Sequence, residues 1–255
     1  MKDYLIFQLY GPLASWGEIA VGEVRPSAAY PSRSALLGLL AAALGVERGE
    51  GAALAALAEA YRFGVKLHWE GQVLRDYHTV QRGPALRKHT YRTRRQELGF
   101  VPRDQLDTML TSREYRVDSY ASVALLPTEE APHSLDVLAA ALGAPRFPLY
   151  LGRKSCPLAL PLAARVAPFA DLRSALDALG PEQIDGLLGS RTDPLRRVAR
   201  RAAPRYYWDA RLGPEGLAPG TTPSLTLTRH DEPTSRQRWQ FAPRQEYLLI
   251  EEARP

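Results

Sequence analysis

The residues best suited to chemistry lie in a loop between an apolar segment, residues 4–10, and a run of small and aliphatic residues that ends at Gly45. Where that run begins, Ser32 or Ser34 can cap a helix by accepting from the free N–H groups of its first turn. Aromatic and basic side chains lie around this helix start, namely Trp16, Arg25, Tyr30 and Arg33. Free donors and the positive end of a helix dipole suit a phosphate. The sequence therefore predicts a site that binds a nucleic-acid backbone.

Each of these side chains also has a purely structural interpretation. Arg25 and Arg33 are either RNA contacts or ordinary exposed arginines on a loop. Trp16, which precedes Gly17, either stacks on a nucleobase or fills the gap between the loop and a sheet. The sequence leaves both interpretations open.

Catalytic chemistry has little support in the sequence. The five histidines are scattered, without HxH or HExxH spacing, and the single cysteine, Cys156, excludes an internal disulfide and a cysteine-rich zinc site. No metal and no cofactor is therefore expected, and Cys156 is expected to be packed rather than reactive. The best catalytic candidates are Lys88 and His89 with a tyrosine such as Tyr30. Metal-independent RNA cleavage needs a base and a cation near the scissile phosphate, and these residue types supply them.

Residues 81–116 form a basic segment without apolar periodicity. The segment contains nine basic and four acidic residues, so its net charge of +5 equals that of the whole chain. The basic residues are Arg82, Arg87, Lys88, Arg92, Arg94, Arg95, Arg103, Arg113 and Arg116. Because such a segment cannot form a core of its own, we expect an arm that orders against a partner. A solvated surface loop is the alternative.

The apolar pattern predicts the elements that position these residues. Strands are expected at residues 4–10, 63–69, 72–78, 120–126 and 148–151, and helices at residues 34–44, 52–61 and 133–142. A tight hairpin through Glu70 and Gly71 should join the second and third strands. The order of strand, helix, paired strands, helix and strand predicts an α+β fold with a ferredoxin-like (RRM-like) domain over residues 1–160.

The remaining residues, 161–255, are expected to form a smaller, mostly β subdomain. Its predicted helices cover residues 171–179 and 181–188, and its predicted strands cover residues 224–228 and 247–251. A basic run from Arg191 to Arg205 is either a solvated helix face or a contact with DNA phosphates or a neighbouring subunit.

Two further groups of polar residues are candidate RNA contacts. Asp76 and His78 share one face of a predicted strand. Either they touch RNA, or an internal pair of Arg75 with Asp76 holds the predicted hairpin together. Arg153 and Lys154 follow a glycine that allows close approach of a backbone. The mildly basic net charge of +5 also indicates an anionic partner. The chain opens directly on a strand and has no apolar run near 18 residues, so we expect a cytoplasmic protein without a membrane partner.

Three sequence blocks between residues 9 and 162 resemble one protein family. They are GPLASWGE followed by RPSAAYPSRSALLGLLAAALG, then LRDYHTV from Leu74, and YLGRKSCPLALPL from Tyr150. Together they resemble the CasD family of CRISPR-associated proteins, a subunit of the type I-E Cascade complex. Residues from Ala163 onward contain no comparable block.

The resemblance implies a non-catalytic subunit that holds the 5′ handle of the CRISPR RNA and caps the guide-carrying backbone. It implies a thumb-like hairpin at the basic segment, and as partners the backbone subunit, the large subunit and target DNA in the assembled complex. The RNA-binding candidates are then Trp16, Arg25, Tyr30, Ser32, Arg33, Ser34, His78, Arg82, Lys88, His89, Arg92, Arg94, Arg95, Arg113, Arg153 and Lys154. A metal-independent endoribonuclease that processes precursor CRISPR RNA, as in type I-C relatives, and a generic RNA-recognition module are the alternatives.

Overall fold

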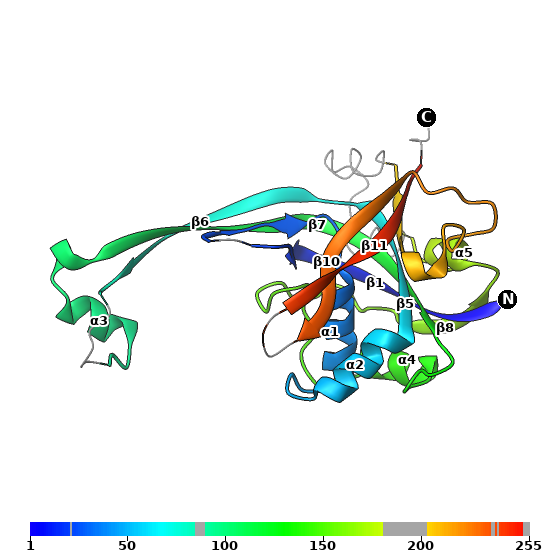
Figure 1. The fold of residues 1–255 in the computed structure, drawn as a ribbon, viewed down its shortest axis with the longest axis horizontal. Helices are drawn as coiled ribbons and strands as arrows, with labels where there is room; N and C mark the ends of the chain where they lie inside the picture. The colour runs from blue at the N-terminus through cyan, green and yellow to red at the C-terminus, as the bar shows by residue number, and fades with distance from the viewer. Residues whose placement is uncertain (21, 85–89, 181–202, 236–237, 239, 252–255) are drawn as a thin grey trace.

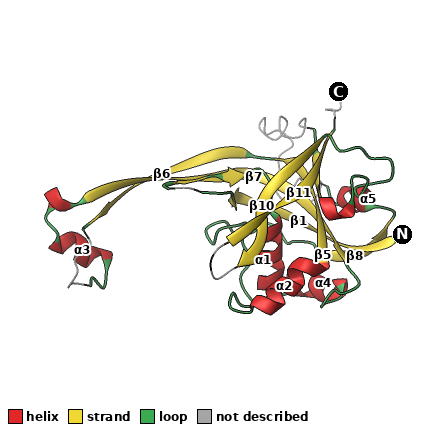
Figure 2. Ribbon diagram, viewed as in Figure 1, coloured by secondary structure: helices red, strands yellow, loops and turns green. Residues whose placement is uncertain are grey.

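The computed structural model describes residues 1–20, 22–84, 90–180, 203–235, 238 and 240–251. Within them, one sheet contains nine strands, and seven of these follow the order β10-β11-β9-β5-β7-β1-β8 (Figures 1 and 2). These seven are β1 (Lys2–Ala14), β5 (Tyr61–Trp69), β7 (Asp107–Pro127), β8 (Arg165–Phe169), β9 (Arg205–Asp209), β10 (Leu225–Ser235) and β11 (Gln240–Ile250). The other two, β3 (Val24–Arg25) and β6 (Gln72–Arg82), each pair with β7.

Helices cover both faces of this sheet. The described α-helices of the body are α1 (Arg33–Leu44), α2 (Gly51–Ala60), α4 (Leu135–Gly143) and α5 (Leu172–Asp177), and α3 (Arg94–Phe100) lies apart from them. Successive residues of a strand point to opposite faces, so in β1 Phe7 packs in a core with α1 and α4 while Ile6 packs in a second core with α5. A separate two-stranded sheet pairs β2 (Trp16–Gly17) with β4 (Ser27–Ala28).

The predicted helix at residues 34–44 is confirmed, and its ends have the expected chemistry. Ser32 is the N-cap, and its Oγ accepts a hydrogen bond from the Ala35 N–H at 3.2 Å. Gly45 ends the helix in a left-handed conformation with φ of 79°, which glycine adopts without steric cost. The predicted helix at residues 133–142 is confirmed as α4, and that at residues 52–61 as α2.

The expected hairpin between residues 63–69 and 72–78 is wrong. Instead of pairing with each other, β5 and β6 both pair antiparallel with β7, which is 21 residues long. The pairing passes from β5 at Trp69↔Tyr120 to β6 at Gln72↔Val117, so the chain does not reverse between the two strands. Gly71, with φ of 68°, lets the chain bend at this point instead of turning back.

Because β6 and residues 107–115 of β7 have no further long strand beside them in the described part of the chain, they extend from the body as a two-stranded projection, which we call the ribbon (Figure 1). Helix α3 and a short 3-10 helix (Arg103–Gln105) lie at its far end. The predicted basic segment began at residue 81, whereas the projection begins at Gln72, so residues predicted as a body strand belong to the ribbon.

The expected strand at residues 148–151 is also wrong. The described residues form only a single bridge there, Tyr150↔Pro157, and the chain turns at Gly152, whose φ is 85°. The strand that pairs with β1 at this side of the sheet is β8.

Residues after 161 extend the same sheet. β8 pairs with β1, and β9 pairs with both β5 and β11. The strands expected at residues 224–228 and 247–251 correspond to β10 and β11, and the helix expected at residues 171–179 corresponds to the shorter α5. The helix expected at residues 181–188 and the basic run up to residue 202 lie outside the described residues. The division into two domains at residue 160 stays a prediction.

The bend at Gly71 generates the first prediction. A Cβ at this position would lie 2.2 Å from the Val117 carbonyl oxygen, at a φ that side chains rarely adopt. Gly71→Ala should therefore lower the free energy of unfolding by roughly 1–3 kcal/mol in chemical denaturation.

Gly38→Ala is the matched control, because Gly38 lies in α1 and a Cβ there would meet nothing within 4 Å. This substitution should raise stability by roughly 0.5–1 kcal/mol. Equal stability of Gly71→Ala and the parent protein would contradict the assignment of the bend.

Candidate nucleic-acid interface

The N-terminus of α1, which the sequence predicted to bind a phosphate, is already occupied by a carboxylate of the chain itself. The Arg33 N–H in the first turn donates to Asp231 Oδ2 of β10 at 2.7 Å. Ser32 is buried as the helix cap, and its Oγ lies 3.0 Å from Ser34 Oγ. The favourable end of the helix dipole is therefore used inside the protein.

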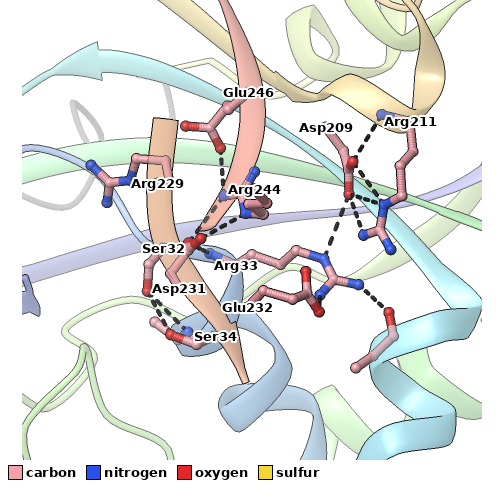
Figure 3. A network of polar contacts seen from close by, with 12 residues as sticks. Ser32, Arg33, Ser34, Asp209, Arg211, Arg229, Asp231, Glu232, Arg244 and Glu246 are labelled. Carbon is pink, nitrogen blue, oxygen red and sulfur yellow. Dashed lines mark hydrogen bonds and ion pairs between the residues drawn. The ribbon is translucent and has the colours of Figure 1, made fainter. Parts of the chain in front are cut away.

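The Arg33 side chain points into the protein and is surrounded by acceptors (Figure 3). The residue is 2% exposed, and its Nη1 lies 2.5 Å from Glu232 Oε1 while its Nε lies 3.5 Å from Asp209 Oδ2. Its remaining guanidinium nitrogen donates to the Ala58 carbonyl of α2. Burial removes hydration from the cation, so the neighbouring carboxylates are needed to stabilise it.

The network continues through a second buried arginine to the predicted RNA residue Tyr30. Arg244 Nε lies 2.7 Å from Asp231 Oδ1, and its Nη2 lies 2.7 Å from Glu246 Oε2. The Tyr30 hydroxyl donates to Glu246 Oε1 at 2.6 Å, and its ring stacks on Tyr207 with centroids 3.6 Å apart. Burial, together with the Glu246 charge, raises the pKa of Tyr30. The structure thus places Tyr30 in an internal cluster.

A third arginine neutralises the carboxylate of Asp209. Arg211 Nη2 lies 2.5 Å from Asp209 Oδ2. Burial alone would raise the pKa of Asp209, but the hydrogen bonds from Arg211 and the nearby Arg33 charge hold it below its usual value. In this cluster, which we call the buried network, four carboxylates (Asp209, Asp231, Glu232 and Glu246) face three guanidinium groups (Arg33, Arg211 and Arg244). Such a set carries no excess positive charge with which to attract a phosphate.

Trp16 has the structural role that the sequence left open, which is to fill the gap between the loop and the sheet. The residue is 4% exposed and belongs to the core that α1 and α4 share. Its backbone N–H donates to Ser27 Oγ at 3.0 Å, and its ring lies beside the turn at Gly152. The buried ring offers no surface on which a base could stack.

Exposed basic side chains gather instead where the ribbon leaves the body. Arg25 of β3 lies next to Arg113 of β7, and Asp76 of β6 lies opposite Arg113, so the three share one face. Both arginines are exposed. Among the residues that the structure describes, neither forms an ion pair. We call this surface the ribbon-base face.

Arg153, in the turn after Gly152, also lies at the ribbon-base face, because it contacts Tyr115 of β7. Tyr115 follows Arg113 by two positions in β7 and therefore points to the same face. The Arg153 guanidinium lies 5.5 Å from the centroid of the Tyr115 ring, and its Nε donates to Ser15 Oγ at 2.8 Å. Lys154 is exposed beside it. Tyr115 is not among the RNA-binding candidates predicted from the sequence, although its two-residue spacing from Arg113 in a strand was a signal that could have identified it.

His78 and Asp76 lie together farther along this face, with His78 Nδ1 3.3 Å from Asp76 Oδ2. The opposite face of the ribbon differs in charge. There Arg75 Nη2 lies 2.8 Å from Glu114 Oε1, and this hydrogen bond lowers the pKa of Glu114. Arg113 on one face of the ribbon therefore has no ion-pair partner among the described residues, whereas Arg75 on the opposite face is paired with a carboxylate.

The far end of the ribbon carries the other candidates. Arg94 Nη1 lies 2.6 Å from Glu97 Oε2, Arg82 lies opposite Asp107, and Arg92 and Arg95 are exposed. Lys88 and His89 lie outside the described residues. In the part of the chain that is described, no three or more His, Cys, Asp or Glu side chains are grouped so that they could hold a metal ion. The described helices also include none that is long and apolar enough to cross a membrane.

Comparison with known proteins assigns the family. The family model described as CRISPR-associated protein (Cas_Cas5) matches residues 4–247. The chain therefore belongs to this family of CRISPR-associated proteins. It is 33% identical over 227 residues to the CRISPR system Cascade subunit CasD of Escherichia coli (strain K12), a match that covers 82% of this chain and 96% of that relative. The resemblance to the CasD family is thereby confirmed.

Two solved structures share the fold. A chain of a CRISPR RNA-guided surveillance complex is 26% identical with a TM-score of 0.58, and the match covers 98% of this chain and 90% of that one. A structure titled as a Cas protein is 25% identical with a TM-score of 0.55, covering 97% of this chain and 94% of that one. The similarity thus extends past residue 162, where the three sequence blocks ended.

The buried network generates the second prediction. Arg33→Met retains most of the side-chain volume but removes the cation that pairs with Glu232, while Asp209 keeps only Arg211. Removing one partner of a buried ionic cluster should lower the free energy of unfolding by roughly 3–5 kcal/mol. Denaturation of the purified chain measures the change.

Arg25→Met is the control, because Arg25 is exposed on the ribbon-base face. It should alter stability by no more than about 0.5 kcal/mol. If Arg33→Met is as stable as Arg25→Met, the network is not what holds α1 to the C-terminal strands.

Proposed function

We propose that this chain is a non-catalytic RNA-binding subunit of a Cascade surveillance complex and that it holds the 5′ handle of the CRISPR RNA. The single observation that carries the proposal is the ribbon-base face, where Arg25 and Arg113 are exposed side by side and the half-buried Arg153 lies over Tyr115. Guanidinium groups that have no carboxylate partner can bind phosphates in a bidentate manner and stack on bases. The family match and the Cascade relative support the assignment to the complex.

The strand order supports the ferredoxin-like part of the proposal. The order β5-β7-β1-β8 is antiparallel throughout, with α1 between β1 and β5 in the chain and α4 between β7 and β8. This is the strand-helix pattern that RNA-recognition modules use. The ribbon is then the proposed arm, which extends from the second and third strands of that pattern and lies across the guide RNA, while the chain caps the guide-carrying backbone.

The alternative of a metal-independent endoribonuclease receives less support. Of its candidate residues, Tyr30 is buried, its hydroxyl donates a hydrogen bond to Glu246, and its ring stacks on Tyr207, so it does not face a surface where RNA could lie. Lys88 and His89 lie outside the described residues. A generic RNA-recognition module is disfavoured by the family match, which spans nearly the whole chain.

The third prediction tests the ribbon-base face. Arg25→Ala combined with Arg113→Ala should weaken binding of a 5′-handle RNA, measured by fluorescence anisotropy over a series of salt concentrations. Each phosphate contact that is lost should reduce the slope of log affinity against log salt by about 0.7, so the double variant should lose about 1.4.

Arg75→Ala is the matched control, since Arg75 lies on the opposite face of the same ribbon and pairs with Glu114. Its affinity and salt slope should stay close to those of the parent. Unchanged binding by the double variant would refute the proposed interface.

Full-length repeat RNA incubated with the protein in EDTA should remain intact; a discrete cleavage product would favour the endoribonuclease instead.

A further inference from the structure

The ribbon leaves the body through a bend with two unusual backbone conformations. Gly71 has φ of 68°, and Asp118, on the facing strand β7, has φ of 59°. Asp118 is one of two non-glycine residues with positive φ in the described part of the chain. L-residues adopt this conformation only where the surrounding structure fixes it, and aspartate tolerates it better than most.

The surrounding structure holds both the side chain and the backbone of Asp118. The Tyr10 hydroxyl donates to Asp118 Oδ1, and Trp69 Nε1 donates to the Asp118 carbonyl oxygen at 2.5 Å. These two donors come from β1 and β5, the neighbours of β7 on either side. Asp118 is therefore fixed from both directions across the sheet.

The donors themselves are immobilised in an aromatic cluster. Tyr10 and Trp69 are 5% and 8% exposed, and both pack against Tyr120, which is fully buried. The ring centroids of Tyr10 and Tyr120 are 6.4 Å apart, and those of Trp69 and Tyr120 are 5.1 Å apart. Leu160 completes the cluster. The two side chains that donate to Asp118 are thus packed in a buried aromatic cluster.

The strand pairing shows why this residue matters for the ribbon. β5 ends its pairing with β7 at Trp69↔Tyr120, and β6 begins at Gln72↔Val117, so Asp118 lies in the gap between them. On its other edge, β7 stays paired with β1 until Ala14↔Arg116. Asp118 therefore lies at the junction between the body and the ribbon.

We propose that Asp118 is a positioning residue, which the Tyr10 and Trp69 donors hold in its left-handed conformation, and which fixes the angle between the ribbon and the body. The ribbon acts as a lever: eleven residues of β6 span roughly 36 Å, so a change of about 10° at the bend displaces the far end by about 6 Å. This inference concerns geometry and does not depend on the proposed RNA contact.

Double electron–electron resonance between two spin labels tests the proposal. Cysteines are introduced in place of Glu59 on α2 and Thr108 near the far end of the ribbon, and the native Cys156 is buried and should remain unlabelled. The parent protein should give one narrow distance peak. Asp118→Gly, which permits many backbone conformations, and Tyr10→Phe, which removes only the donor, should each lose that single peak and give a broad distribution.

Asp118→Asn is the conservative rescue, because asparagine tolerates positive φ and its carbonyl oxygen accepts from the Tyr10 hydroxyl. It should retain the narrow peak. The thermal midpoint of each variant is measured in parallel, so that broadening in a protein that remains folded is distinguished from unfolding. A narrow peak at the parent distance in folded Asp118→Gly and Tyr10→Phe, or a broad distribution in the parent itself, would overturn the proposal.

Discussion

The burial of the Arg33 guanidinium at the start of α1 is the constraint on which the rest of the structure depends. A desolvated cation requires carboxylates at close range, and here Asp209 and Glu232 supply them from β9 and β10. The Arg33 N–H adds a bond to Asp231, 198 positions later in the chain. The first helix and the C-terminal strands are therefore positioned by the same ionic cluster, which explains how one sheet extends across both halves of the sequence.

This constraint also separates the arginines of the chain by function. Those in the buried network are paired with carboxylates, and the N-terminus of α1, where the sequence predicted a phosphate, is occupied by Asp231. On the ribbon-base face, Arg25 and Arg113 are exposed, and Arg153 lies half-buried over the Tyr115 ring. The bend at Asp118 then decides where that surface and the ribbon beyond it point. The body therefore uses one set of arginines for internal packing, and a different set is available for the RNA recognition that we propose.

Features encoded by neighbouring residues could be predicted from the sequence, whereas those that depend on distant partners could not. The ends of α1 follow from a serine cap and a glycine in left-handed conformation. The hairpin at Gly71 was predicted wrongly because a glycine with positive φ serves a turn or a bend equally well, and only the length of β7 decides between them. The structural role of Arg33 could not be predicted, because its partners, Asp209 and Glu232, are distant in the sequence.

Arginine-selective modification with phenylglyoxal, read out by mass spectrometry with and without bound 5′-handle RNA, tests this division most directly. The account predicts that Arg25 and Arg113 react in the free chain and are protected by the RNA. It also predicts that Arg33 and Arg244, at the centre of the buried network, stay unmodified in both states of the folded protein. Modification of Arg33 in the free chain and its protection by RNA, with Arg113 reacting equally in both states, would contradict the account.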